Sequence, residues 1–316
     1  MRRAWCFQER VLASRTLHFA RNQMYWECEH GFDQEINAMG RGKIKHYDEF
    51  SLERVANGLK EAYRSPHPDI ERQPWFLMVR QYTSRELTKQ SDKLPALSGV
   101  ISELEKRLPG DKCYAGIWKS WFVRGMLWRL QNPEIDLTVM APKQPQNVPW
   151  RAPSWSFNSL EGVVLYETYH GMSDTCAKLL ECCLTPKSKL NPLGALYAGY
   201  AMIIAPISTI VSIESQVTTK GTACMIQLKN GSLTAATIFF DVDRYDSAKA
   251  LMITPHLGIV IVPLGAHRET YTRVGMISVN PLWDPIKEPN LLRSAHPPKR
   301  FLRASAFPEP VPVTIH

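Results

Sequence analysis

The stretch MRRAWCFQERVLASRTLHFARNQMYWECEH, residues 1–30, contains two different periodicities of apolar residues. Between Arg3 and Leu12, the side chains of Trp5, Glu9 and Leu12 fall on one helical face. The period then changes to two, and apolar residues alternate with polar ones on both sides of a turn at Arg21–Gln23; the apolar set is Leu17, Phe19, Met24, Trp26 and Cys28. The stretch therefore predicts a short helix followed by a β-hairpin.

The composition is that of an ordinary globular protein of 316 residues, with 44% hydrophobic and 22% charged residues. The net charge is +8, and Lys and Arg are spread along the chain, so we interpret it as solvated surface, with nucleic-acid binding as the lesser alternative. Residues 1–15 lack the apolar run of a signal peptide, and no stretch reaches the roughly 18 apolar residues of a membrane span. The seven cysteines lack the spacing of a disulfide scaffold, which favours a reducing compartment and a cytoplasmic protein.

The middle of the chain, residues 48–131, follows a mainly helical pattern. Pro74 stands near one expected helix start, and Ser91 or Asp92 is placed to cap another helix. Cys113–Leu130 carries tryptophans and other large apolar residues at helical spacing, which predicts a buried helix.

The second half of the chain has the pattern of β-strands. Tyr200–Ile213, its most apolar run, is β-branched and interrupted by Pro206, as expected of strand rather than of a membrane helix. Asn230-Gly231 predicts a hairpin with a type I′ turn, and further strands are expected at 257–263 and 271–279. Several short strands with turn signals predict a mostly antiparallel barrel or strongly twisted sandwich.

The predicted fold class is therefore α+β, with five parts along the chain. They are a helix–hairpin unit (1–47), a helical segment (48–131), a Pro-rich linker (132–153), a β-rich region (154–284) and a Pro-rich basic tail (285–316). The composition of the tail predicts that it is disordered or loosely draped.

Few side chains form a recognisable chemical motif. Gly40–Gly42 is too short for a phosphate loop, and the thiols of Cys28 and of Cys182-Cys183 lack the spacing of a zinc site, so we expect no metal. Ser154 and Ser156 lack the flanking glycines of a nucleophile elbow.

One carboxylate stands out, that of Glu9, because it lies one helical turn beyond Trp5 and Cys6 in a stretch expected to face the core. A carboxylate near aromatic rings can be desolvated and tuned for acid–base or electrostatic work. The alternative, which spacing alone favours, is a helix-surface charge paired with Arg2, Arg3 or Arg10.

The order of several motifs resembles a known family. Arg3-Ala4-Trp5-Cys6-Phe7-Gln8-Glu9, followed by Leu17-His18-Phe19 and Tyr25-Trp26-Glu27-Cys28, resembles the last block of the fungal heterokaryon-incompatibility (HET) domain. Later segments are similar to the region that follows this domain in many members; they include Tyr82–Arg85, Ser91–Gly99, Tyr114–Trp118 and Arg151–Ser156. The resemblance covers about Arg2 to Gly275, and its motif residues are Trp5, Cys6, Trp26, Cys28, Asp92, Pro153 and Trp155.

This resemblance implies a filamentous-fungal protein of the allorecognition class, which triggers programmed cell death through protein partners when incompatible hyphae fuse. The HET domain is similar in fold to TIR domains, some of which cleave NAD. The helix of those enzymes that carries Trp-Cys-x-x-Glu matches Trp5, Cys6 and Glu9, so the resemblance implies a catalytic role for Glu9. Residues 1–47 thus resemble the C-terminal part of a TIR-like α/β HET domain.

Two blocks of the family pattern do not occur in this chain. HET domains begin with a segment of the type Tyr-x-x-Leu-Ser-Tyr-x-Trp-Gly, followed by one of the type Trp-Ile-Asp-x-x-Cys-Ile-Asn-Gln, and these supply most of the presumed nucleotide pocket. A lone glutamate cannot position a dinucleotide. We therefore expect a truncated form without catalytic activity of its own and without a cofactor. NAD is expected as a ligand only under the alternative that the chain is part of a longer TIR-like NAD-hydrolysing protein.

A second alternative places the function in the β-rich region. In this hypothesis Pro153–Pro281 is a protein- or small-molecule-binding module, and the HET-like segment is only attached to it. If the first strands of the sheet are missing, the strands Leu17–Phe19 and Met24–Cys28 are expected to expose an unpaired sheet edge and apolar side chains, which invites self-association.

Overall fold

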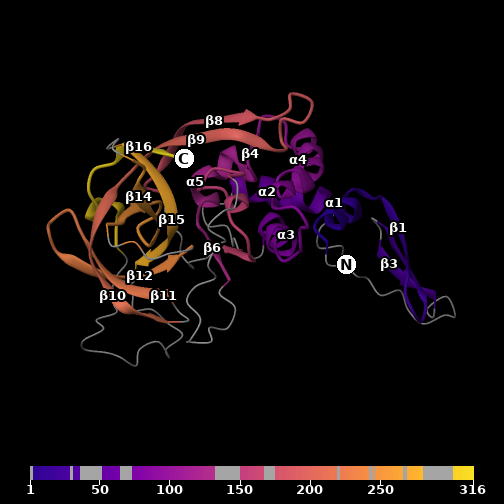
Figure 1. The fold of residues 1–316 in the computed structure, drawn as a ribbon, viewed down its shortest axis with the longest axis horizontal. Coiled ribbons are helices and arrows are strands. Elements are labelled where there is room, and N and C mark those ends of the chain that lie inside the picture. Colours follow the sequence, from indigo (N-terminus) through magenta and orange to yellow (C-terminus); the bar gives the residue numbers. More distant parts are fainter. Residues whose placement is uncertain are drawn as a thin grey trace.

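The computed structural model combines short helices with one large, mostly antiparallel sheet (Figure 1). No helix among the described residues is long and apolar enough to cross a membrane. The residues described are 3–28, 31–35, 52–64, 73–131, 150–166, 175–218, 221–241, 245, 247–265, 269–279 and 302–316.

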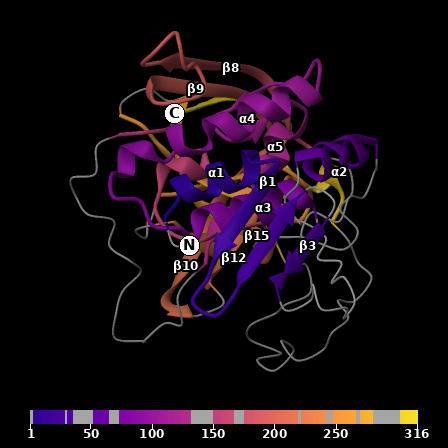
Figure 2. The same ribbon diagram turned by 90° about the vertical axis from the view of Figure 1, so that its right-hand side faces the viewer.

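The predicted N-terminal helix and hairpin are confirmed. Helix α1 (Trp5–Leu12) is followed by the antiparallel strands β1 (Arg15–Phe19) and β2 (Met24–Cys28). A third strand that the sequence pattern did not predict, β3 (Gly31–Gln34), pairs with β2. This three-stranded sheet projects from the body beside α1, and Figure 2, viewed from that end, shows it in front of the other elements.

Helices α2 (Leu52–Arg64), α3 (Pro74–Thr83) and α4 (Pro95–Arg107) confirm the helical pattern of the middle segment. Pro74 and Pro95 stand at helix starts, where their missing N–H groups cost no intrahelical bond. The predicted cap at Ser91 or Asp92 is wrong: α4 begins after Leu94, whose side chain makes no capping bond, and a short 3₁₀ turn (Gln90–Asp92) precedes it.

The buried helix predicted for Cys113–Leu130 is also wrong, although most of its apolar residues are buried. The segment forms two short strands, β4 (Cys113–Tyr114) and β5 (Ile117–Trp118), then a 3₁₀ turn (Lys119–Trp121), α5 (Phe122–Gly125) and strand β6 (Trp128–Leu130). The cause is backbone geometry. Ala115 and Gly116 have φ values of +47° and +92°, which reverse the chain and cannot occur in a right-handed helix.

The predicted linker lies mostly outside the described residues, which resume at Trp150. Arg151, Ala152 and Pro153 are buried rather than draped over the surface. A 3₁₀ turn (Phe157–Ser159) and strand β7 (Val164–Tyr166) follow, and β7 pairs antiparallel with β6.

In the described part of the chain, nine strands form one sheet in the order β12-β11-β10-β13-β14-β15-β16-β9-β8. An additional pairing of β12 with β15 links the first six strands of this order in a cycle, in which β15 also pairs with β16 outside the cycle. The strands are β8 (Lys178–Pro186), β9 (Leu196–Ala205), β10 (Ile207–Thr218), β11 (Gly221–Gln227), β12 (Leu233–Phe240), β13 (Lys249–Met252), β14 (Leu257–Pro263), β15 (Thr270–Val279) and β16 (Val311–Ile315). The prediction of a mostly antiparallel β-rich region is confirmed, with Pro206 separating β9 from β10.

The Asn230-Gly231 hairpin joins β11 to β12, as predicted. Its turn is not type I′, because in the described residues Ala115 is the one non-glycine residue with positive φ, whereas type I′ requires positive φ at Asn230. Gly231, with φ of +82°, donates its N–H to the Leu228 carbonyl, and the Asn230 side chain accepts from the N–H of Ser232.

The predicted disordered tail is wrong for its last residues. Strand β16 lies between β15 and β9, parallel to the first and antiparallel to the second. Val313 and Ile315 are buried there, and His316 exchanges backbone hydrogen bonds with Ser154 and Tyr271. The part of the tail before residue 302 lies outside the described residues.

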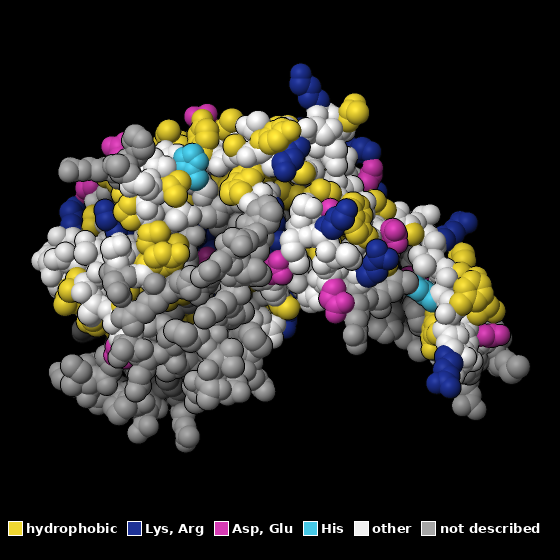
Figure 3. All heavy atoms as spheres, viewed as in Figure 1, with side chains coloured by type: hydrophobic (Ala, Val, Ile, Leu, Met, Phe, Trp, Pro, Cys, Tyr) yellow, Lys and Arg dark blue, Asp and Glu magenta, His cyan; other side chains and the backbone are white. Residues whose placement is uncertain are grey.

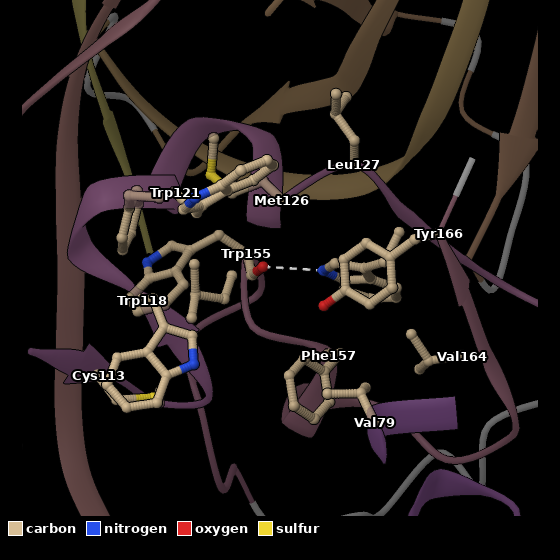
Figure 4. Close-up of a cluster of buried hydrophobic side chains, with 14 of the residues drawn as sticks. Val79, Cys113, Trp118, Trp121, Met126, Leu127, Trp155, Phe157, Val164 and Tyr166 are labelled. Carbon is tan, nitrogen blue, oxygen red and sulfur yellow. Dashed lines mark hydrogen bonds between the residues drawn. The ribbon is translucent and has the colours of Figure 1, made fainter. Parts of the chain in front are cut away.

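Buried hydrophobic side chains of the described residues form two clusters, one of which extends from Phe7 on α1 to Ile315 on β16, while the other lies among the strands of the large sheet. In the first cluster the rings of Trp155 and Phe122 are tilted against each other with their centres 4.9 Å apart. The carbonyl of Trp155 accepts a hydrogen bond from the indole N–H of Trp128 (Figure 4). Because this core is continuous, the helical segment and the large sheet share it.

Candidate functional site

Helix α1 is fixed by contacts on its buried side. The indole N–H of Trp5 donates to the carboxylate of Asp92 over 3.2 Å, and the side chain of Gln8 accepts from the backbone N–H of Gly99 over 2.9 Å. Phe7 is buried, with the guanidinium of Arg85 5.0 Å from its ring centre. The helix therefore packs on the start of α4 and presents its opposite side outward.

Glu9 lies on that outward side and is exposed. The prediction that the Glu9 carboxylate faces the core and is desolvated is therefore wrong. The position agrees with the alternative that spacing alone favours, a helix-surface charge. Of the partners named for it, Arg10 donates to Glu27 on β2 over 2.6 Å, and Arg2 lies outside the described residues.

Glu27 is a charged group that sequence reasoning missed. Its two carboxylate oxygens bind Arg10 and the imidazole of His18, at 2.6 and 2.7 Å. Burial alone would raise the pKa of Glu27, but the hydrogen bonds from Arg10 and His18 outweigh it and the pKa is lowered. A carboxylate held ionised by two donors is a weak proton acceptor, so this cluster fixes the sheet to α1 rather than performing acid–base chemistry.

The opposite face of the three-stranded sheet is apolar and open to solvent. Leu17 pairs with Trp26 and Phe19 with Met24, so these four side chains share one face. They are 46%, 42%, 78% and 38% exposed, respectively. We call these four residues the apolar face. Cys28 on β2 shares this face by alternation and is half-buried, as is Cys6 on α1, and neither forms a disulfide.

The remaining predicted motif residues are structural. Asp92 is the acceptor for Trp5, and Pro153 packs against β9, where a Cβ on Gly199 would lie 2.7 Å from its ring. Trp155 is fully buried in the core of Figure 4. The structure thus brings Trp5 and Asp92 together, and it places Trp26 and Cys28 on β2 of the separate three-stranded sheet.

A second polar group that the sequence did not reveal surrounds Arg151. Its guanidinium donates to the Asn158 carbonyl over 2.8 Å and to the side chain of Gln90 over 3.0 Å. Lys93, which is 4% exposed, donates its ammonium to the carbonyls of Phe157 and Leu160. Burial lowers the pKa of Lys93 to about 7, and the charge of Arg151 adds to the effect.

A third group joins the large sheet to the helical segment. Arg273 on β15 binds the carboxylate of Asp241 and the carbonyl of Trp128 on β6, and its guanidinium lies 3.5 Å from the Trp128 ring centre. Its backbone N–H donates to the hydroxyl of Ser154 over 2.9 Å. The side chains of Arg273 and Asp241 are both buried, so this ion pair stabilises the fold and is not an open binding site.

Among the described residues there is no cluster of His, Cys, Asp or Glu that could hold a metal ion. Searches with family models, against curated proteins and against solved structures found no match to this chain. The apolar face is therefore the candidate functional site. Packing of the core does not account for the exposure of these four side chains. Monomeric proteins rarely leave contiguous apolar groups in water, so a binding role is the natural reason for it.

Proposed function

We propose that this chain belongs to the heterokaryon-incompatibility (HET) family and acts in fungal allorecognition and programmed-cell-death signalling. In this proposal it works in the cytoplasm through protein contacts made by the apolar face, without catalytic activity of its own, and residues 1–47 correspond to part of a TIR-like domain. The motif resemblance over about Arg2 to Gly275 is the basis of the family assignment.

One observation carries the proposal beyond the motifs. Trp5 and Asp92 belong to two separate blocks of the resemblance, 87 positions apart, and they are joined by a hydrogen bond of 3.2 Å. Such a contact is expected if the HET-like block and the segment that follows it work as one unit. The exposure of the apolar face supports a binding role.

Inducible expression of the chain in a filamentous fungus tests the function. We expect growth arrest and hyphal compartments that take up a vital dye, and we expect Trp26→Ser, on the apolar face, to reduce both. Tyr197→Ser is the matched control, because Tyr197 is 67% exposed on β9, outside this face. Normal growth across a panel of strains, with the protein accumulating in soluble form, would contradict the proposal.

The NAD-hydrolase alternative is favoured by one observation, the exposure of Glu9 on α1, since a catalytic carboxylate must reach its substrate. Incubation of the chain with NAD, followed by chromatographic measurement of nicotinamide, tests this alternative. Release that disappears in Glu9→Gln supports it, whereas release that is unchanged in that variant removes Glu9 from the reaction.

The alternative of a β-rich binding module draws on exposed apolar side chains of the sheet, such as Leu180 on β8. Strand β16 argues against an independent Pro153–Pro281 module, because it pairs with both β15 and β9 but lies outside that range. An isolated Pro153–Pro281 fragment that melts cooperatively would favour this alternative.

A further inference from the structure

The sequence contains two Asn-Gly pairs, which lie in different backbone environments. Asn57-Gly58 is inside helix α2, and Asn230-Gly231 is in the turn between β11 and β12. In such a pair the nitrogen of the glycine can approach the side-chain amide of the asparagine, because glycine has no Cβ to obstruct it. Both asparagines are exposed, so solvent reaches both amides. A difference in their chemistry must therefore come from the backbone.

In the turn, the side chain of Asn230 folds back over the peptide bond that follows it. Its Oδ1 accepts a hydrogen bond from the backbone N–H of Ser232 over 3.0 Å and a second one from the Ser232 hydroxyl over 2.6 Å. The ring closed by the first of these bonds includes the nitrogen of Gly231, which keeps the amide carbon of Asn230 on the same side of the turn as this nitrogen. Two donors on Oδ1 also stabilise the negative charge that this oxygen gains when a nucleophile attacks the amide carbon.

The nitrogen of Gly231 has room to move toward that carbon. Its N–H donates to the carbonyl of Leu228 over 2.9 Å, and residues 229–233 are all exposed, so water can replace this bond. Among the described residues, nothing lies within 4 Å of the position that a Cβ on Gly231 would occupy. Figure 3 shows mainly polar and backbone atoms over the strands of the large sheet, at the left of the view. The turn thus presents both reacting atoms to solvent.

Helix α2 holds Asn57-Gly58 in the opposite arrangement. Side chains of a helix lean toward its N-terminus, so the Asn57 amide is directed away from the nitrogen of Gly58. Gly58 lies in the interior of the helix, where its N–H belongs to the ladder of bonds to the carbonyl four positions before. It is also buried against α3, since a Cβ on Gly58 would lie 2.7 Å from the ring of Pro74. Attack on Asn57 therefore requires that the helix first open at a packed position.

We propose that Asn230 is a site of spontaneous deamidation in the folded protein, whereas helix α2 protects Asn57. Hydroxide takes the N–H proton of Gly231, and the nitrogen forms a bond to the amide carbon of Asn230. The bond from this carbon to Nδ2 breaks, and Nδ2 leaves as ammonia with a proton from water, which regenerates hydroxide. Water then opens the five-membered ring at either carbonyl and gives aspartate or isoaspartate. The reaction consumes one water, releases one ammonia and does not depend on the proposed function.

The product places a negative charge next to Lys229, which connects the hairpin to the segment before β16. The Lys229 ammonium binds the carboxylate of Glu309, and its backbone N–H donates to the carbonyl of Ala306 over 2.9 Å. A carboxylate at position 230 competes with Glu309 for the ammonium, and isoaspartate also lengthens the backbone by one methylene group. We therefore expect deamidation to loosen the contact between this hairpin and residues 302–309.

Peptide mapping by mass spectrometry, after incubation of the full chain at mildly alkaline pH, tests the site. Attack at Gly58 must first break a helix hydrogen bond, so we expect aspartate and isoaspartate to form at Asn230 roughly tenfold faster than at Asn57. In urea the two rates should converge, because both pairs are then unfolded and each is Asn-Gly. Equal rates in the folded chain overturn the proposal. A difference that persists in urea removes the fold as its cause.

Two variants test the geometry and the consequence. Ser232→Ala removes one donor from Oδ1 and should slow conversion at Asn230, with Asn57 of the same protein as the internal control; an unchanged rate removes Ser232 from the reaction. Asn230→Asp carries the new charge on a normal backbone and should melt at a lower temperature than the unmodified chain. Protein deamidated at this site, separated by ion exchange, should melt lower still. Identical melts of the three proteins overturn the loosening of the hairpin.

Discussion

The guanidinium of Arg273 lies 3.5 Å from the ring centre of Trp128 and at the same time binds the buried carboxylate of Asp241. Arg273 comes from β15 of the large sheet and Trp128 from β6, in the segment after the helices, so this contact joins the two halves of the chain. Their separation is 145 positions in sequence, which no local pattern can register.

Replacing Arg273 by Met is expected to destabilise the fold strongly, because it leaves the Asp241 charge buried without its partner. Breaking one side of a buried pair costs roughly 3–5 kcal/mol in free energy of unfolding. Urea denaturation followed by tryptophan fluorescence measures this loss. The control is Arg303→Met, at an exposed position, for which we expect a change of less than about 0.5 kcal/mol. Equal urea midpoints for the two variants would mean that the Arg273–Asp241 pair does not contribute to the free energy of unfolding.

Lys93 should make stability depend on pH in the alkaline range. Its pKa is lowered from 10.5 to about 7 in the fold, so between these values the unfolded chain binds more protons than the native one. The free energy of unfolding should then rise with pH above 7, by at most about 1.4 kcal/mol per pH unit from this group. Below pH 7 this gain is absent, because both states are protonated.

Denaturant titrations at a series of pH values from 7 to 9 measure the Lys93 effect. Lys93→Met should lose the slope assigned to this group, whereas Lys89→Met, at an exposed position on the same segment, should keep it. Parallel pH profiles for the wild type and Lys93→Met would show that Lys93 does not titrate in this window.

A comparison of two glycines with the same φ separates the energetic cost of backbone strain from that of a side-chain clash. Gly116 and Gly110 both have φ of +92°, but a Cβ at Gly116 would lie 2.6 Å from the Phe157 ring, and at Gly110 nothing lies within 4 Å. Gly110→Ala is expected to cost about 1–2 kcal/mol through backbone strain alone. Gly116→Ala should cost more, since Phe157 must also move, and thermal melts of the two variants give the difference directly. A smaller shift for Gly116→Ala than for Gly110→Ala would rule out this packing.

The C-terminal strand offers a matched pair of valines. Val313 is 1% exposed and Val311 is 43% exposed on the same strand β16. Val313→Ala should lower the free energy of unfolding by about 1.5–3 kcal/mol, because a buried side chain is lost, and Val311→Ala by a fraction of that. Indistinguishable melts would argue that β16 does not occupy its place between β15 and β9 in solution.

The sequence by itself determined the elements whose cause is local. The change of apolar period after Leu12 placed the α1 helix and the β1–β2 hairpin, and Pro206 separated β9 from β10, because side-chain periodicity and a missing backbone donor act within a few residues. The same alternation that defined β1 and β2 put Leu17 and Trp26 on one face. Alternation alone could not say that this face stays open to solvent; that expectation came from the absence of the family's first blocks.

Only the tertiary structure decided where long-range partners meet. Ala115 and Gly116 reverse a segment whose apolar spacing resembles a helix, and the carbonyl of Ala115 is held by Ser156 and Asn158, about forty positions away, which a periodicity cannot encode. Strand β16 joins the sheet although its proline-rich composition predicts disorder, because the gap between β15 and β9 exists only once those strands have folded. Glu9 is turned outward and Glu27 binds Arg10 and His18 for the same reason. Burial and partner choice follow from the assembled surfaces of the protein, not from spacing along its chain.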